Sequence, residues 1–201
     1  MRFIIGLLVC LLALPVANAY AMKLSAVGAM VSSQPAETTQ IHDANSSLGA
    51  GVLLELGMVP MIGLELGALS ISRKSSQTVG TTTTMTKKEL YEFPVLLRVN
   101  LGSMLSFGFG GYYARYQGKI FEEATTGASV TSAEYAYSDK FATQHDYGLA
   151  TSLALYFPLA PLAKFMIDGR YTMGLRDNDT RETYQIKYND YQVLAGLQVG
   201  F

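Results

Sequence analysis

Cysteine is nearly missing from this sequence: among 201 residues there is one, Cys10. A single cysteine cannot form a disulfide within the chain, so the fold needs another source of stability. Charge is also scarce, because charged residues make up 15% of the sequence and hydrophobic residues 49%. The 15 basic and 16 acidic residues nearly balance. No basic excess points to nucleic acid or to a polybasic lipid surface, and we expect no nucleic-acid partner.

Long apolar runs are missing as well once the N-terminus is set aside. The nearest approach to a transmembrane helix is the segment 48–71, which carries Glu55 and Glu65 and is interrupted by Pro60. Carboxylates at the centre of a membrane helix are costly, and proline breaks a helix. The apolar residues are instead dispersed in alternation with small and polar ones, which is typical of a membrane β-barrel.

The N-terminus has the layout of a secretory signal peptide. Arg2 precedes an apolar block at 3–14, and Ala17 and Ala19 form a small-residue cleavage site. We therefore expect residues 1–19 to be cleaved and residues 20–201 to form one domain. Since Cys10 lies in the apolar block, the expected mature domain has no cysteine.

Period-two alternation predicts eight strands, each long enough to cross the hydrocarbon core when tilted. They are 22–32, 46–58, 61–74, 87–99, 104–118, 143–157, 162–176 and 188–201. Short turns alternate with longer polar connections, the layout of barrels with tight periplasmic turns and long external loops. The longer connections are 33–45, 75–86, 119–142 and 177–187. The prediction is an all-β protein: an eight-stranded antiparallel transmembrane β-barrel, built as an up-and-down meander.

One face of the predicted strands is apolar and the other collects charge. The inner charges are Glu55, Glu65, Glu92, Arg98, Lys164, Asp168, Arg170 and Arg176. Side chains just fill the interior of an eight-stranded barrel, and unpaired buried charges are costly. We therefore predict a ladder of paired acids and bases, either as structural filling or as a switchable ion or proton path. The first strand, 22–32, is apolar on both parities, so its register stays open.

Aromatic residues at the strand ends predict girdles at both membrane interfaces. Tyrosines are expected at the external end, namely Tyr91, Tyr113, Tyr147 and Tyr191. Phenylalanines are expected at the periplasmic end, namely Phe107, Phe157, Phe165 and Phe201.

Three short motifs resemble a known family. The last six residues, Gly-Leu-Gln-Val-Gly-Phe, are similar to the C-terminal assembly signal of outer-membrane proteins, with Leu194 where a polar residue is usual. The segments 92–99 and 146–149 resemble the OmpA-like and OmpX-like small outer-membrane β-barrel domains of the porin-family type. The resemblance implies a bacterial outer-membrane location in contact with the lipid bilayer and lipopolysaccharide. It also implies that the barrel-insertion machinery reads Gly196, Val199 and Phe201.

Catalysis has little support in the sequence. Some eight-stranded barrels resemble lipid A deacylases that use a histidine beside a serine, but only His42 and His145 are available, and Tyr147 stands where the serine is needed. A nucleophile and its base must lie within hydrogen-bonding reach. Two histidines are also a weak signal for a metal site. We expect no enzyme activity, no catalytic residue, no metal and no cofactor.

The favoured function is a structural role in the envelope, with the external loop 119–142 available to an extracellular ligand. A narrow channel for ions or small solutes is the alternative. A soluble lipocalin-like binding barrel is a lesser alternative, and it would turn its apolar residues inward.

Overall fold

The computed structural model describes residues 22–37, 43–180 and 186–201. The predicted signal peptide, residues 1–19, lies outside the described residues, as does His42. Nine strands and one short 3-10 helix follow in order. They are β1 (Met22–Glu37), β2 (Asp43–Val59), β3 (Ile62–Val79), β4 (Thr82–Leu101), β5 (Leu105–Thr126), β6 (Ser129–Tyr135), η1 (Ser138–Lys140), β7 (His145–Ala160), β8 (Ala163–Gly174) and β9 (Ile186–Gly200).

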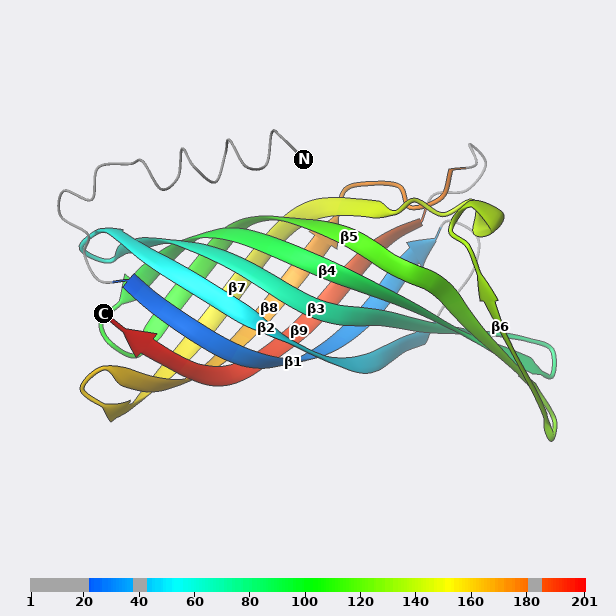
Figure 1. Cartoon of the computed structure of the whole chain (residues 1–201), viewed down its shortest axis with the longest axis horizontal. Helices are drawn as coiled ribbons and strands as arrows, with labels where there is room; N and C mark the ends of the chain where they lie inside the picture. Colours follow the sequence, from blue (N-terminus) through cyan, green and yellow to red (C-terminus); the bar gives the residue numbers. More distant parts are fainter. Residues whose placement is uncertain (1–21, 38–42, 181–185) are drawn as a thin grey trace.

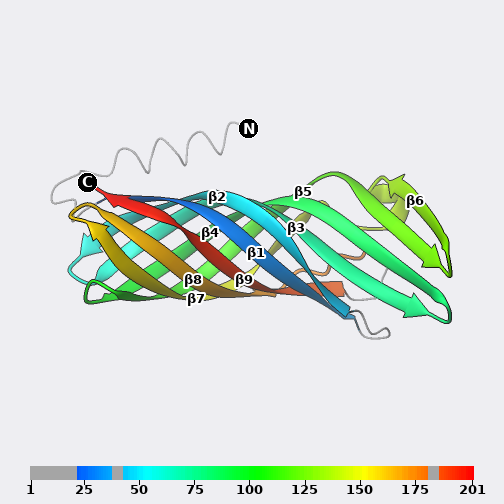
Figure 2. The same ribbon diagram turned by 90° about the horizontal axis from the view of Figure 1, so that it is seen from below.

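Eight of these strands form a closed antiparallel ring, so the predicted fold class is confirmed. The ring runs β1-β2-β3-β4-β5-β7-β8-β9 and closes where β9 pairs with β1. The ninth strand, β6, pairs with the outer end of β5 and lies outside the ring. Figures 1 and 2 show a tilted barrel whose short turns lie at the same end as the C-terminus.

No helix in the described ranges is both long and apolar enough to span a bilayer.

The register of β1, which the sequence left open, is set by its two neighbours. Met30 pairs with Leu48 of β2 and with Val193 of β9. Val27 and Val31 are buried in the lumen, whereas Met30 is half exposed on the outside. A strand that is apolar on both parities gives no signal of its own, so pairing on both sides decides which face it turns inward.

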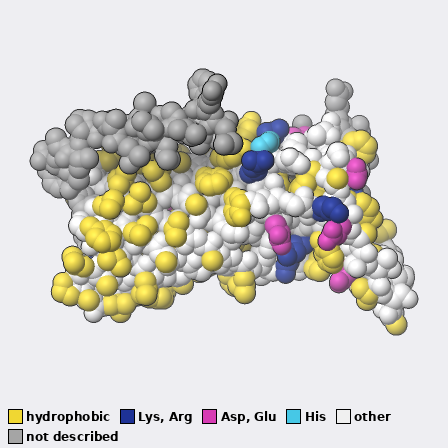
Figure 3. Space-filling view, viewed as in Figure 1, with side chains coloured by type: hydrophobic (Ala, Val, Ile, Leu, Met, Phe, Trp, Pro, Cys, Tyr) yellow, Lys and Arg dark blue, Asp and Glu magenta, His cyan; other side chains and the backbone are white. Residues whose placement is uncertain are grey.

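Alternation places large apolar side chains outside and charges inside. Along β4, Phe93 and Leu97 are exposed, while their neighbours Glu92 and Arg98 are fully buried. Figure 3 shows apolar side chains spread over the half of the molecule near the C-terminus, with charged ones gathered on the other half. An apolar exterior is what lipid accepts, so this half forms the membrane-spanning band.

Two predicted loops turn out to contain strand. Residues 75–86 complete the β3–β4 hairpin, which ends in a tight turn at Gly80 with φ +61°. Residues 119–142 include the end of β5, the whole of β6 and η1, with a second tight turn at Gly127. Threonine-rich runs favour strand and glycine supplies the positive φ, so local chemistry extends both hairpins beyond the membrane. These hairpins project at the end opposite the C-terminus (Figure 1).

Candidate functional site in the barrel lumen

A cluster of four charges crosses the middle of the lumen between β3, β4 and β8. Arg98 donates from Nη2 to Glu65 Oε2 at 2.7 Å and to Asp168 Oδ2 at 2.5 Å. Arg170 donates from Nη2 to Glu65 Oε1 and to Asp168 Oδ2, each at 2.7 Å. All four residues are at most 4% exposed. Two guanidinium groups thus balance two carboxylates, as a buried charge cluster requires.

Nearer the periplasmic end, Glu55 pairs with a lysine that the predicted ladder did not include. Its Oε1 accepts hydrogen bonds from Lys23 Nζ at 2.7 Å and from Asn100 Nδ2 at 2.8 Å. Lys164 instead donates to the backbone carbonyl of Ser103 at 3.0 Å and is partly exposed. Lys23 lies on β1, whose register the sequence left open, which is why its inward orientation was not foreseen.

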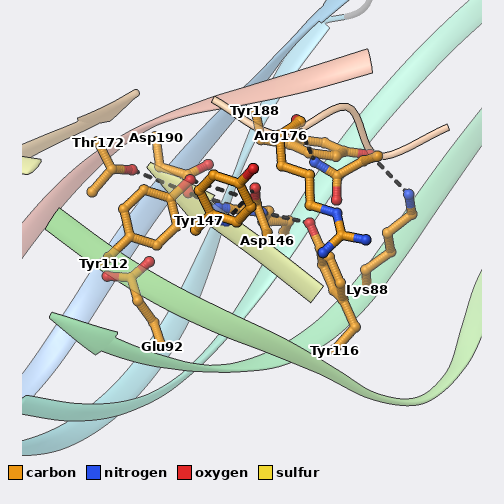
Figure 4. Close-up of polar contacts among 12 residues, drawn as sticks. Lys88, Glu92, Tyr112, Tyr116, Asp146, Tyr147, Thr172, Arg176, Tyr188 and Asp190 are labelled. Atoms are coloured by element: carbon orange, nitrogen blue, oxygen red, sulfur yellow. Dashed lines mark hydrogen bonds and ion pairs between the residues drawn. The ribbon is translucent and has the colours of Figure 1, made fainter. Parts of the chain in front are cut away.

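A second cluster centres on Arg73 in the outer half of the barrel, and Figure 4 shows the surrounding Asp146, Asp190, Tyr112 and Tyr116. Arg73 Nε donates to Asp190 Oδ2 at 2.9 Å, and Nη1 donates to Asp146 Oδ2 at 2.5 Å. The Tyr116 hydroxyl accepts from the same Nη1, and the Tyr112 hydroxyl donates to Asp146 Oδ2 at 3.1 Å. The predicted inner charges did not include Arg73, Asp146 or Asp190. Strand parity could have found it, because Arg73 shares the parity of Glu65, and Asp146 and Asp190 alternate with outward tyrosines.

Aromatic rings close the lumen above Arg73. Its Cζ lies 4.9 Å from the centre of the Tyr188 ring, within the range of a cation–π contact. Lys88 donates to the Tyr188 hydroxyl at 2.9 Å. Arg176, predicted as an inner charge, follows the end of β8 and lies beside Tyr116 in Figure 4. It belongs to the external mouth of the barrel, not to the ladder within it.

Glu92 lies between the two clusters without a cationic partner among the described residues. Both of its carboxylate oxygens accept from Gln192 Nε2, at 3.0 and 3.1 Å. Leu96, Met166 and Leu194 are at most 1% exposed and pack in the same lumen. Ion pairs, an amide contact and apolar side chains therefore fill the spanning part of the barrel.

The external mouth is covered by the segment after β6. Tyr137 is 2% exposed, its hydroxyl donates to the Gln117 carbonyl at 3.4 Å, and its ring centre lies 5.6 Å from that of Tyr116. Burial raises the pKa of Tyr137 to about 12, and the nearby Tyr188 and Glu89 add to the shift. A cavity of about 150 Å³ lies at this mouth. Its lining includes Lys88, Ile120, Lys140, Asn178 and Tyr188.

His145 is held by a tyrosine on the outer surface. Its Nδ1 lies 2.6 Å from the Tyr113 hydroxyl, and the two rings stack at 5.9 Å. Within residues 22–37, 43–180 and 186–201, no three His, Cys, Asp or Glu side chains form a group suited to a metal ion.

The predicted assembly-signal residues lie on the closing strand β9. A Cβ added to Gly196 would meet the backbone of β1 at Ala26 and Val27. Val199 and Phe201 are exposed on the outer face, and the Phe201 amide donates to the Met22 carbonyl at 2.8 Å. The glycine thus allows the seam to close, and the two apolar residues face the membrane side.

A closed antiparallel ring with an apolar exterior and a charged, filled interior defines an integral outer-membrane β-barrel protein. The chain belongs to the outer membrane protein beta-barrel domain family, whose match covers residues 19–180. The family resemblance, the outer-membrane location and the Gram-negative envelope setting are thereby confirmed. The soluble lipocalin-like alternative is wrong, since the large apolar side chains face outward. No curated protein matches the sequence.

Solved structures of outer-membrane proteins align with this chain at low sequence identity. The outer membrane protease OmpT from Escherichia coli aligns with a TM-score of 0.54 at 9% identity, covering 92% of this chain and 98% of its own. Ail of Yersinia pestis, solved with the heparin analogue sucrose octasulfate, aligns with a TM-score of 0.50 at 14% identity, covering 88% and 98%. Neisserial surface protein A aligns with a TM-score of 0.49 at 11% identity, covering 90% and 99%.

Proposed function

We propose that this protein is a non-conducting scaffold of the outer membrane that stabilises the envelope and holds two hairpins outside the cell. The observation that carries the proposal is the filled lumen. The buried cluster around Arg98 crosses the barrel at its centre, and the cluster around Arg73 crosses it again further out. An ion would have to break several short ion pairs in succession to pass, and each break leaves a buried charge without its partner.

Planar-bilayer conductance of the refolded protein tests this role against the narrow channel. The wild type should give no steady conductance. Arg98→Ala, which opens the central cluster, should give small or intermittent currents, while Lys119→Ala on the external hairpin should match the wild type. Steady wild-type currents that change in Glu92→Ala or Arg98→Ala would establish the channel and overturn the scaffold proposal.

The external hairpins support a surface role. The β5–β6 hairpin extends past the ring of the barrel and exposes Val130, and Phe141 is exposed close by. Ail, a protein of the same fold, was solved with a polyanionic ligand. Here the hairpin carries Glu122, Glu123 and Glu134, so its charge opposes a polyanion. We infer that the segment 119–142 contacts a protein partner outside the cell.

A shortened hairpin tests this contact without disturbing the barrel. Phe121 and Glu134 are Cα partners, so replacing 122–133 with an Asn-Gly turn keeps the remaining strands in register. Adhesion of expressing cells to cultured host cells, or their sensitivity to a phage panel, should fall while the outer-membrane level of the protein stays constant. Unchanged adhesion and unchanged phage sensitivity would rule out the surface role.

We also propose that the protein has no catalytic activity. His145 is the histidine with a described side chain, and its partner is the phenol of Tyr113, not a serine hydroxyl. The serine beside a histidine that lipid A deacylases use is therefore not formed at His145. The mass of lipid A should be unchanged in cells that express the protein, and loss or gain of an acyl chain would contradict the proposal.

A further inference from the structure

Three outward side chains stand in one row across β4, β5 and β7 at the external edge of the apolar band. Arg115 is the Cα partner of Tyr91 on one side and of His145 on the other. Two residues back along β5, Tyr113 is exposed and pairs with Tyr147. Aromatic girdles mark the depth of the lipid headgroups, so Arg115 is the first charge on its strand beyond that depth.

Arg115 carries a free charge at this position. Its side chain is exposed between the buried Ala114 and Tyr116, so it points away from the lumen. It forms no ion pair or side-chain hydrogen bond with the part of the chain that the structure describes. Both neighbouring strands are described at this level, and neither offers a carboxylate to it in the same row.

His145 adds a second donor beside Arg115. In the tautomer in which Nδ1 accepts from the Tyr113 hydroxyl, 2.6 Å away, Nε2 is the N–H donor of the imidazole. The stacked Tyr113 ring holds the imidazole in place. The Arg115 guanidinium fork and the imidazole N–H therefore lie on adjacent strands in the same row and can both donate to an oxyanion.

The acids nearest this level are already engaged. Glu89 accepts from Lys87 Nζ at 2.8 Å. Asp177 Oδ1 accepts the backbone amides of Asp179 and Ile186, each at 3.0 Å. Figure 3 shows histidine and basic side chains together at the border between the apolar band and the charged outer half. Neither Glu89 nor Asp177 is therefore hydrogen-bonded to Arg115.

We propose that Arg115 and His145 bind a phosphate group of lipopolysaccharide in the outer leaflet. A phosphate matches the bidentate geometry of arginine. The acyl chains of the same lipid would lie against the apolar band on the periplasmic side of Arg115. Tyr113 and Phe109 are exposed on this part of β5. The site lies outside the lumen, so it goes beyond the scaffold role and does not depend on it.

Native mass spectrometry of the refolded full domain in detergent tests this site. The probes are lipid A with both phosphates, lipid A with neither, and inorganic phosphate. Arg115→Ala should weaken binding of the bisphosphorylated lipid roughly tenfold, the size expected for one charge-assisted contact. Arg115→Lys keeps the charge but loses the bidentate fork, so it should bind more tightly than Arg115→Ala and more weakly than the wild type, and His145→Gln should weaken binding by a smaller factor than Arg115→Ala. Lys119→Ala is the matched control, because it also removes one positive charge from β5. Lys119 lies four residues beyond Arg115 and pairs with Glu134 at 3.5 Å, so this variant should bind as the wild type does.

Four results would overturn the proposal. If Arg115→Ala and His145→Gln both bind like the wild type, neither residue contributes to the site. If Lys119→Ala loses as much affinity as Arg115→Ala, the lipid binds through unspecific surface charge. Equal wild-type affinity for phosphorylated and dephosphorylated lipid A would show that the headgroup phosphate is not what binds. Displacement of the lipid by inorganic phosphate at equal concentration would show that the site takes free phosphate and does not select the lipid. Heat-modifiable mobility of each variant confirms that it is folded before binding is compared.

Discussion

Arg98 and Asp168 lie 2.5 Å apart across the lumen, although 70 positions separate them in the sequence. Arg98 projects from β4 and Asp168 from β8, two strands that are not neighbours in the ring. Their contact therefore ties opposite walls of the barrel together. The same pair is joined by Glu65 and Arg170, so each charge has more than one partner.

Removing Arg98 should destabilise the barrel strongly. Arg98→Ala leaves two buried carboxylates to one guanidinium, and breaking a buried pair in this way costs about 3–5 kcal/mol. The measurement is the urea midpoint for unfolding from lipid vesicles, followed by heat-modifiable mobility. Lys119→Ala removes one partner of an exposed pair and should change the free energy of unfolding by less than about 1 kcal/mol. Equal midpoints for the two variants would show that the central cluster does not stabilise the barrel.

Glu92 and Glu65 should respond in opposite ways to the same substitution. Glu65→Gln removes a carboxylate that two arginines share and should cost about 3–5 kcal/mol. Glu92→Gln removes a charge that has no described cation, and its new amide N–H can donate to Gln192 Oε1, which is unpartnered among the described residues. The variant should be as stable as the wild type or more stable by about 1 kcal/mol. A large loss in Glu92→Gln, measured by the same urea titration, would mean that its carboxylate has a cationic partner in the membrane.

The sequence predicted which residues face the lumen better than which of them meet. Alternation depends on the strand alone, so the inward sides of Glu65, Arg98 and Arg170 could be read directly from the sequence. Pairing depends on how the ring closes and how far its strands are staggered, and Glu65 meets Arg170 across 105 positions. Lys23 illustrates the limit, because only pairing with β2 and β9 fixes the orientation of β1.

The external region was harder to predict for a different reason. Polar, threonine-rich segments such as 81–86 look like loops by composition, yet they continue strands whose pairing begins inside the membrane. The pairing of β3 with β4 continues from the membrane-spanning part to Val79 and Thr82, where Gly80 allows a turn. Local composition therefore indicated a connection at 75–86 but not how far the two strands extend into it.

Tyr137 should titrate at unusually high pH. Because burial raises its pKa to about 12, the docked segment favours the neutral phenol. An unfolded or undocked tyrosine ionises near pH 10, so the stabilisation is complete below about pH 10 and is lost as the pH rises through about 12. The measurement is the tyrosinate absorbance of the wild type minus that of Tyr137→Phe between pH 9 and about 13. A difference curve with a midpoint near pH 10 would show that Tyr137 is not buried at the mouth.

Gly196→Ala should obstruct closure of the barrel at the seam between β1 and β9. The added Cβ would meet the carbonyl of Ala26, which is rigid backbone, whereas a Cβ at Gly200 finds its nearest neighbour, the Leu162 carbonyl, 4.0 Å away. Refolding into lipid vesicles without any insertion machinery isolates this steric effect. The yield of folded, heat-modifiable protein should fall severalfold for Gly196→Ala and stay near the wild-type level for Gly200→Ala.

The same assay separates closure from recognition by the insertion machinery. Phe201 is exposed at the end of the chain, so Phe201→Ala should refold in vesicles nearly as well as the wild type but reach the outer membrane of cells less efficiently. Gly196→Ala should fail in both settings because its defect lies in the pairing of β9 with β1. If Gly196→Ala refolds normally in vesicles and fails only in cells, the glycine acts as a recognition residue, and the steric explanation is wrong.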